Sequence, residues 1–406
     1  MDTRSRRTIV SWKAHEDGIL GLEEWVEASC LLTSGRDNKL NLFELPETLP
    51  ILGNASSTSS LPSKSSPPKL LYTMDINALN YCRFSLLDIE AEDESMKGKA
   101  REKREAWVAV PNLTNSETID IFHLPSQTRP HAAIGFVSSD PDTSLGRGAL
   151  DPDKTGLVMF VHLLTPTTIL VGTESGHVLF FEYEGRAGDV TDARLDAHAV
   201  KSSSLGRKEK SRWVRRWKEK IHREAVMGLA VSPSKDFALS VSADHQVVKY
   251  YLDPYCPEGS SRFEIFKINQ LGNSSIHING TGRVCAVAGW DGNVRLFSTK
   301  SFKSLGTLSY HRDTCHILSF AHRSSIPTNF NATGVHANLE IDSGTENGSS
   351  DEEEDTDESN EGGMRKMNRQ ALSRDHWLAT GGVDKRVAVW ELMDFEKRSV
   401  NKKSTR

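Results

Sequence analysis

Short apolar segments alternate with polar turns along most of this 406-residue chain. The clearest example lies in residues 286–297, AVAGWDGNVRLF. An alternating apolar segment, 284–288, leads into Asp291 and Gly292, and a second alternating segment, 294–297, follows directly. An Asp-Gly dipeptide between two alternating segments is a strong hairpin signal. We therefore predict two antiparallel strands joined by a tight turn at Asp291.

An aromatic residue follows the turn aspartate at a separation of six residues, and this spacing recurs along the chain. Four copies carry the aspartate: Asp37 with Phe43, Asp244 with Tyr250, Asp291 with Phe297 and Asp384 with Trp390. Two weaker copies carry serine instead: Ser116 with Phe122 and Ser175 with Phe181. Each copy has an apolar strand pattern before the turn and another after it. The pattern therefore predicts six repeats of one hairpin-based unit.

Three of the repeats have a histidine ahead of the turn, and the first two histidine–aspartate pairs share a separation of 22 residues. A turn carboxylate that accepts hydrogen bonds from a histidine and from backbone amides can be buried, whereas burying an unpaired one is costly. We therefore interpret the repeated residues as a structural motif of the repeats. Its members are His15, Asp37, His222, Asp244, Asp291, His311, Thr380, Asp384 and Trp390.

The last repeat carries the most complete set of these groups, because His311, Thr380, Asp384 and Trp390 supply an imidazole, a hydroxyl, a carboxylate and an indole. Elsewhere Phe or Tyr replaces Trp, so the indole donor is missing. A hydroxyl, a histidine and a carboxylate can be mistaken for a catalytic triad. Each group recurs at one position of a repeat instead of converging on one site. We therefore predict no catalytic, cofactor-binding or metal-binding residue.

The repeats resemble those of the WD-repeat β-propeller family, in which a histidine step, strands and a Trp-Asp pair mark each four-stranded blade of about 40–45 residues. The resemblance implies an all-β protein, a WD40-type β-propeller with six countable repeats. It covers most of the chain, although Phe and Tyr replace the signature Trp in most copies.

The stretches between the repeats resemble a narrower family, the fungal WD-repeat proteins called ASTRA-associated protein 1. The blocks 77–85 and 108–135 carry this resemblance, together with the segments SWKAHEDGILGL and GWDGNVRLFSTKSFKSL. It extends from about residue 11 to residue 392. Members of that family look seven-bladed, with a further repeat ahead of the segment that resembles residues 8–15. The resemblance therefore implies that the first blade is missing here, apart from its last strand.

This narrower resemblance implies a non-catalytic scaffold subunit of the nuclear ASTRA complex. The implied partners are the transformation/transcription-associated pseudokinase, the Tel–Tti co-chaperone proteins and the RuvB-like ATPases. The implied processes are chromatin remodelling and the maturation of phosphatidylinositol-kinase-like kinases. It assigns no individual binding residue. We also predict no cofactor, no association with a membrane and no direct binding of nucleic acid.

Composition divides the chain into a propeller, residues 1–392, that is interrupted by polar segments, and a basic tail, 393–406. Residues 46–68 are rich in Ser and Pro and predict a surface loop, and 184–211 predict a second polar loop. Residues 322–371 interrupt the last repeat. Because seven of the eight residues from 351 to 358 are acidic, we expect this insertion to be disordered.

Charge and cysteine usage exclude several classes of protein. The net charge of −5 does not suggest a nucleic-acid binder. The chain has an odd number of cysteines, five, and no Cys-x-x-Cys motif, so we expect reduced, buried thiols. No run of eighteen apolar residues and no apolar signal region is present, and we therefore expect neither secretion nor a membrane span.

Residues 211–222 interleave basic side chains with Trp213 and Trp217. Such a pattern can bind nucleic acid, because aromatic rings stack on bases and basic groups attract phosphates. It also fits the outer strand of a blade whose tryptophans pack on a neighbouring strand. We favour the outer strand.

The ends of the repeat series leave the closure of the ring open. Residues 8–12 alternate and predict a strand that either pairs beside residues 387–390 and closes six blades, or leaves a gap in a ring with seven-fold packing. Within the second repeat, residues 78–84 also predict a strand, and 88–105 predict a loop.

The sequence lacks the features expected of several other functions. A phosphate-binding loop, a zinc-protease motif and a nucleophile elbow are absent from the sequence. A signalling propeller like the G-protein β subunit would carry an N-terminal coiled coil, and residues 1–10 contain no heptads. A propeller hydrolase would gather carboxylates or a metal in the channel. A generic WD-repeat adaptor is the remaining alternative.

Overall fold

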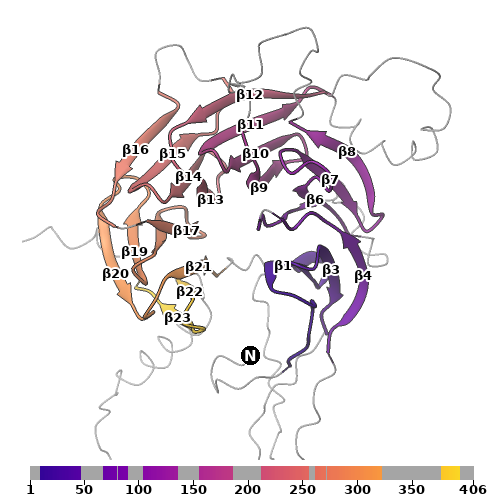
Figure 1. Ribbon diagram of the computed structural model, residues 1–406, viewed down its shortest axis with the longest axis horizontal. Helices are drawn as coiled ribbons and strands as arrows, with labels where there is room; N and C mark the ends of the chain where they lie inside the picture. The colour runs from indigo at the N-terminus through magenta and orange to yellow at the C-terminus, as the bar shows by residue number, and fades with distance from the viewer. Residues whose placement is uncertain are drawn as a thin grey trace, which may run out of the picture.

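The computed structural model describes residues 10–46, 67–79, 81–89, 104–135, 155–185, 212–255, 261–270, 272–321 and 376–393. These residues form twenty-three β-strands and one short 3-10 helix, η1 (Val26–Ala28). The strands build six antiparallel sheets, which follow one another around a ring (Figure 1). This arrangement confirms the predicted all-β propeller with six repeats.

Each sheet is one blade, and its strands are adjacent in the order in which they occur in the chain, from the inside of the ring to the outside. Blade 1 contains β1 (Ile19–Trp25), β2 (Cys30–Gly35), β3 (Lys39–Glu44) and β4 (Lys69–Asp75). Blade 2 contains β5 (Ser85–Ile89), β6 (Glu105–Pro111), β7 (Ile119–Leu124) and β8 (Thr128–Ile134). Blade 3 contains β9 (Val158–Thr165), β10 (Thr168–Thr173), β11 (His177–Tyr183) and β12 (Trp213–Lys220).

The second half of the chain repeats this order, except at its end. Blade 4 contains β13 (Val226–Val231), β14 (Phe237–Ser242), β15 (Gln246–Tyr251) and β16 (Phe263–Lys267). Blade 5 contains β17 (Asn273–Ile278), β18 (Val284–Gly289), β19 (Asn293–Ser298) and β20 (Ser304–Ser309). Blade 6 contains three strands, β21 (Cys315–Phe320), β22 (Trp377–Gly382) and β23 (Val387–Glu391).

The turn between the second and third strand adopts a left-handed backbone in most blades, at the residue after the turn aspartate or serine. This residue has a positive φ in four blades: Asn38, Gly176, Gly292 and Lys385. Glycine and asparagine adopt this conformation at low cost. At Gly292 an added Cβ would also lie 2.7 Å from the carbonyl oxygen of His311, so the tight approach itself favours glycine.

The hydrophobic core consists of five separate clusters, and each cluster joins two consecutive blades. Blades 2 to 5 each contribute to two clusters, so both of their faces are apolar. The near-continuous hydrophobic sequences of their strands predict this. Between blades 5 and 6, for example, Ala286 and Leu296 pack with Leu318 and Leu378.

Side chains on the innermost strands also bond to the backbone of the next blade. His162 Nε2 lies 2.8 Å from the carbonyl oxygen of Leu229, and the amide of Phe320 donates to His277 Nδ1 over 3.3 Å. Glu23 occupies the corresponding position of blade 1 and accepts a hydrogen bond from the amide of Leu86. These contacts tie consecutive blades together along the central channel.

Two sequence predictions about strands are wrong. Residues 10–12 form no strand, and Trp12 packs against Phe43 of blade 1, with ring centroids 5.9 Å apart, not beside β23. The alternation in 78–84 belongs to a turn-rich connection, because Ala78, Cys82 and Phe84 are buried as packing residues without pairing. The strand begins after them, at Ser85, and ends at Ile89, inside the predicted loop.

Among the described strands, blade contacts run from β1 to β5, β9, β13, β17 and β21. Blades 6 and 1 lie on either side of an opening in the ring (Figure 1). Of the two predicted alternatives, the described residues therefore show the open ring.

Candidate functional site

The predicted motif residues lie on one face of the ring, which we call the turn face. This face carries the turn between the second and third strands of each blade and the loop that leads into the first strand. In blade 1, His15 Nδ1 lies 2.9 Å from Asp37 Oδ1, and His15 Nε2 lies 2.8 Å from Thr33 Oγ1. The amide of Glu16 donates to Asp37 Oδ2 over 3.0 Å. The carboxylate thus ties the incoming loop to the turn.

Blade 4 repeats this geometry. His222 Nδ1 lies 2.9 Å from both oxygens of Asp244, and His222 Nε2 lies 2.6 Å from Ser240 Oγ. The amide of Arg223 donates to Asp244 Oδ2 over 3.2 Å. His222 and Ser240 are fully buried, so every polar group of the cluster needs its partner.

Blade 6 adds the indole. His311 Nδ1 lies 3.1 Å from Asp384 Oδ1, and His311 Nε2 lies 2.9 Å from Thr380 Oγ1. Trp390 Nε1 donates to Thr380 Oγ1 over 3.2 Å. Because the indole can only donate, the Thr380 hydroxyl accepts from it and also bonds to His311.

The electrostatics of these turns favours the ionised carboxylate. Burial raises the pKa of Asp37, but the amide of Glu16 and the imidazole of His15 outweigh it, and the net effect is a lowered pKa. The pKa of Asp384 is lowered in the same way, against the effect of burial, by His311 and two backbone amides. Each turn therefore stabilises the ionised carboxylate.

Asp291 has no histidine and is bound by a different partner. Arg295 Nη2 lies 2.6 Å from Asp291 Oδ2, and Asn293 donates to the same carboxylate. The Arg295 hydrogen bond, against some burial, lowers the pKa of Asp291 to about 2. In blade 3, the serine copy Ser175 contacts His177 Nδ1 at 2.7 Å, so a hydroxyl replaces the carboxylate.

Two members of the clusters were missed in the sequence, Thr33 and Ser240. Both are buried hydroxyls that contact the histidine. A signal was available, because a hydroxyl precedes the turn aspartate by four residues at Thr33, Ser240 and Thr380 alike.

These groupings have the composition of a catalytic triad but not its accessibility. In blade 4, the Ser240 hydroxyl and His222 are buried, and the exposed edge belongs to the carboxylate. A nucleophile needs a position beside a bound substrate, which a buried hydroxyl does not have. In the part of the chain that the structure describes, no group of three His, Cys, Asp or Glu residues could hold a metal ion.

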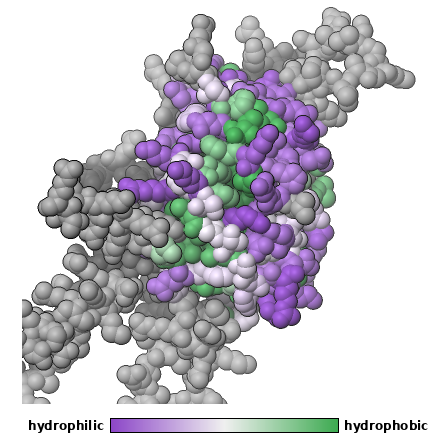
Figure 2. All heavy atoms as spheres, turned by 90° about the vertical axis from the view of Figure 1, so that its left-hand side faces the viewer, coloured by the Kyte–Doolittle hydropathy of each residue, from purple (hydrophilic) through white to green (hydrophobic). Residues whose placement is uncertain are grey.

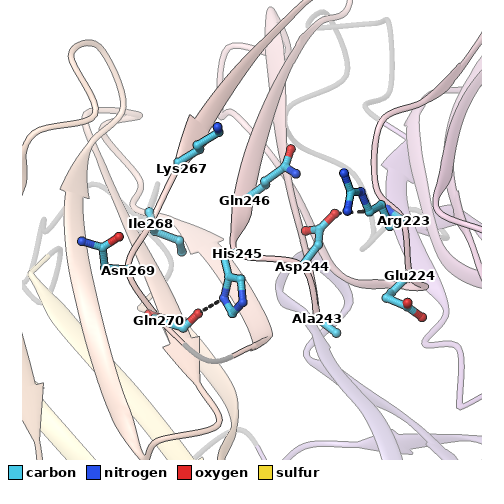
Figure 3. Close-up of a pocket in the computed structure, with 10 residues that line it drawn as sticks. All are labelled: Arg223, Glu224, Ala243, Asp244, His245, Gln246, Lys267, Ile268, Asn269 and Gln270. Atoms are coloured by element: carbon cyan, nitrogen blue, oxygen red, sulfur yellow. Dashed lines mark hydrogen bonds between the residues drawn. The ribbon is translucent and has the colours of Figure 1, made fainter.

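A pocket of about 760 Å³ opens on the turn face at blade 4 and at the connection that leads to blade 5 (Figure 3). Arg223, Glu224, Lys267 and Asn269 reach solvent there. His245 turns toward the carbonyl oxygen of Gln270 and bonds to it. The pocket is polar and of mixed charge, which suits a polar segment of a partner chain better than an apolar small molecule.

The basic segment 211–222 contains β12, the outer strand of blade 3. Trp213 and Trp217 are buried, and Trp217 stacks on Phe180 with ring centroids 5.5 Å apart. Arg216 pairs with Glu182. The aromatic faces are therefore used inside the blade and are not open for stacking on bases.

Four of the five cysteines, Cys30, Cys82, Cys285 and Cys315, are free and buried. Burial raises the pKa of Cys82 and of Cys285 to about 12, so these thiols are not reactive. Cys256, residues 47–66, 186–211 and 322–375, and the tail from residue 394 lie outside the described residues. No helix in the described part is long and apolar enough to span a bilayer.

The fold and the repeated histidine–aspartate turns define a WD-repeat type β-propeller. No protein-family model matches the sequence. Eight curated fungal homologues, 23–28% identical to the chain, carry the name ASTRA-associated protein 1. The protein from Penicillium rubens is 27% identical over 420 residues, which cover 96% of this chain and 89% of the relative.

Two further relatives show the range of the similarity. The protein from Aspergillus flavus is 28% identical over 95% of this chain and 88% of its own length. The protein from Schizosaccharomyces pombe is 26% identical over 79% of this chain and 84% of its own length. The similarity covers most of the propeller, and it confirms the narrower resemblance found in the sequence.

Proposed function

We propose that this chain is a non-catalytic scaffold subunit of the ASTRA complex. The observation that supports the proposal most directly is the name shared by eight fungal homologues that match most of the chain. The geometry agrees with a scaffold, because the hydroxyl–histidine–carboxylate groupings are buried and repeated, and they stabilise turns.

The finer parts of the proposal rest on the family resemblance. We propose a nuclear location and direct partners among the transformation/transcription-associated pseudokinase, the Tel–Tti proteins and the RuvB-like ATPases. We further propose that the chain takes part in chromatin remodelling and in the maturation of phosphatidylinositol-kinase-like kinases. A propeller suits this role because its rims present many loops on a rigid ring.

Affinity purification tests the proposal. The chain, tagged at its C-terminus and expressed in its own organism, is purified from nuclear extract, and the co-purifying proteins are identified by mass spectrometry. Recovery of the three partner groups is the expected result. A folded chain that is recovered without any of them would contradict the proposal and leave a WD-repeat adaptor with other partners.

A charge-reversal pair can show which rim binds. Arg223→Glu with Lys267→Glu changes the pocket on the turn face, where both side chains are exposed. Lys300→Glu is the matched control, because this exposed residue lies in the turn between β19 and β20, at the opposite end of the third strand of its blade. If the turn face binds partners, the double variant loses them and the control keeps them.

A further inference from the structure

Blade 2 replaces the histidine–aspartate clamp with an asparagine network. Asn77, in the loop that leads into β5, donates from Nδ2 to Ser116 Oγ over 2.8 Å and to the carbonyl oxygen of Asn112 over 2.9 Å. Ser116 occupies the position of the turn aspartate, so Asn77 has the role that His222 has in blade 4. Asn77 and Asn112 are 4% and 6% exposed, and buried hydrogen bonds therefore fix the loop on the turn.

The turn of blade 2 is held in the same way. Asn112 Oδ1 accepts from the amides of Thr114 and Asn115 over 3.0 and 2.8 Å. Asn112 Nδ2 donates to the buried carboxylate of Asp120 over 2.8 Å. Arg129 pairs with the other oxygen of Asp120 over 3.1 Å. The residue between Asn112 and Thr114 is therefore held on a fixed backbone.

Large apolar side chains project from this fixed frame into solvent. Leu79 is 76% exposed, Tyr81 is 57% exposed and Leu113 is 53% exposed. Leu79 follows Asn77 by two residues and Leu113 directly follows Asn112, so the two leucines flank the same buried hydrogen bond. Single exposed apolar side chains are common, but a group of them on a rigid frame marks an interaction surface.

The blades that keep the clamp carry a charge where blade 2 has a leucine. The second residue after the clamp histidine is Asp17 in blade 1, Glu224 in blade 4 and Asp313 in blade 6, and all three are exposed. Leu79 is the second residue after Asn77. A side chain as exposed as Leu79 gains little from packing within its blade, so the fold does not explain this exchange.

An aromatic ring and a cation complete this surface at its border with blade 1. The guanidinium of Arg36, in the turn of blade 1, lies 5.1 Å from the ring centre of Tyr81. Tyr81 has a φ of 57°, a left-handed backbone that is unfavourable for an aromatic residue. Its ring nevertheless lies at the surface beside the cation. We call Leu79, Tyr81, Leu113 and Arg36 the blade 2 patch.

Arg36 is available to an acidic group of a partner. Its side chain is exposed, and none of the ion pairs among the described residues includes it. The adjacent Asp37 is held by His15 and by the amide of Glu16. An arginine that lies on an aromatic ring can bind a carboxylate and keep its contact with the ring. The blade 2 patch thus combines an apolar surface with an unpaired positive charge.

We infer that the blade 2 patch is a docking surface for a partner protein, and that it receives a segment with an aliphatic side chain next to an Asp or Glu. The aliphatic side chain packs on the two leucines and the Tyr81 ring, and the carboxylate pairs with Arg36. Because the loop and the turn are already fixed, little conformational entropy is lost on binding. The inference rests on the proposed scaffold function and adds the surface and the chemistry of recognition.

Comparative purification tests the inference with the full chain in its own organism. The parent chain and the double variant Leu79→Glu with Leu113→Glu, both tagged at the C-terminus, are purified in parallel from nuclear extract. The ASTRA subunits that each recovers are then quantified by mass spectrometry. The double variant should recover at least one of them about ten-fold less or worse. Its melting temperature should be unchanged, because both leucines are exposed.

A second pair of exposed aliphatic residues provides the matched control, Ile265→Glu with Leu305→Glu. These residues are 45% and 39% exposed on the outer strands β16 and β20. Figure 2 views this outer side, where apolar and hydrophilic residues mix. The control should recover the same subunits as the parent chain.

The outcomes separate the inference from the proposed function. If the parent chain recovers ASTRA subunits and the patch variant recovers them equally well, the inference is overturned while the proposed function stands. If the parent chain recovers none of them, the proposed function fails and the inference fails with it.

Arginine variants test the acidic part of the expected segment. Arg36→Glu should lower recovery of the same subunit about ten-fold, whereas Arg36→Lys, which keeps the charge, should lower it less. Arg312→Glu is the control, because this exposed arginine lies on the turn face of blade 6. Full recovery with Arg36→Glu would show that Arg36 binds no carboxylate and would overturn the proposed chemistry.

Labelling measures whether the blade 2 patch is free before a partner binds. In a Cys256→Ser background, Leu79→Cys and Leu305→Cys are labelled separately with a maleimide, because the four described cysteines are buried. Similar rates are expected in the free chain, and a rate about ten-fold slower at Leu79→Cys in the purified complex. A slow rate at Leu79→Cys in the free, monomeric chain would mean that the same polypeptide covers the patch. A dimer that Leu79→Glu converts to monomer would assign the patch to a second copy. Either result would overturn the inference.

Discussion

His222 and Asp244 are 22 residues apart in the sequence, yet their side chains meet at 2.9 Å on the turn face of blade 4. The contact closes a loop that contains the first two strands of the blade. Ser240 completes it on the other ring nitrogen, at 2.6 Å. The same three kinds of group recur in blades 1 and 6. The contact therefore acts as a repeated clamp on the blade.

Removing the imidazole tests the importance of this clamp. His222→Ala leaves the carboxylate of Asp244 and the hydroxyl of Ser240 with one partner fewer in a buried site, which costs about 2–4 kcal/mol of unfolding free energy. Urea denaturation followed by fluorescence measures the change. Glu224→Gln, an exposed change two residues away, is the control and should cost less than about 0.5 kcal/mol. Equal effects of the two variants would show that the clamp is not stabilising.

Acid sensitivity should depend on Arg295. The folded-state pKa of Asp291 is about 2, below its usual value near 4, so its ion pair stabilises the fold above pH 4 and is lost as the pH falls from about 4 to 2. Arg295→Gln removes the partner that lowers this pKa. The variant should be less stable at pH 7 and should lose less further stability between pH 4 and 2 than the parent chain. Denaturation midpoints across this range check the prediction.

Glu23 should show the opposite pH dependence. Burial, opposed by the amide of Leu86, raises the pKa of Glu23 to about 7. A raised folded-state pKa means that the related stability is fully present below about pH 4.5 and is lost as the pH rises through about 7. Glu23→Gln keeps an acceptor for Leu86 but carries no charge. It should be neutral at pH 4 and stabilising at pH 8 in urea titrations, whereas the exposed change Glu24→Gln should show no such difference.

Much of this fold could be predicted from a single spacing. The turn aspartate and the aromatic residue six positions later mark strands whose pairing the structure reproduces, as between Val287 and Arg295. Such hairpins are local, so sequence periodicity is sufficient to find them. The prediction of a strand in 78–84 was wrong because it relied on alternation alone. Buried residues of a turn-rich connection alternate like a strand, and only the partner strand shows that pairing begins at Ser85.

The arrangement of the site was less accessible to sequence. His311 and Asp384 are 73 residues apart, and an acidic insertion lies between them. Their pairing could be proposed only because the histidine and aspartate of the other two pairs are much closer in the sequence, 22 residues apart. The partner of Asp291 could not be proposed at all, since an arginine four residues later replaces the histidine. The openness of the ring depends on how consecutive blades are inclined, which no local pattern encodes.

Two corresponding valines offer a direct comparison of a buried and an exposed strand position. Val294 is buried between blades 5 and 6, whereas Val387, at the same register position of blade 6, is 73% exposed. Val294→Ala removes two buried methyl groups and should cost about 2 kcal/mol of unfolding free energy, because a cavity forms. Val387→Ala, made in the free chain, should cost less than about 0.5 kcal/mol. If both substitutions cost the same in urea denaturation, Val387 is packed in solution, which would contradict its exposure in the structure.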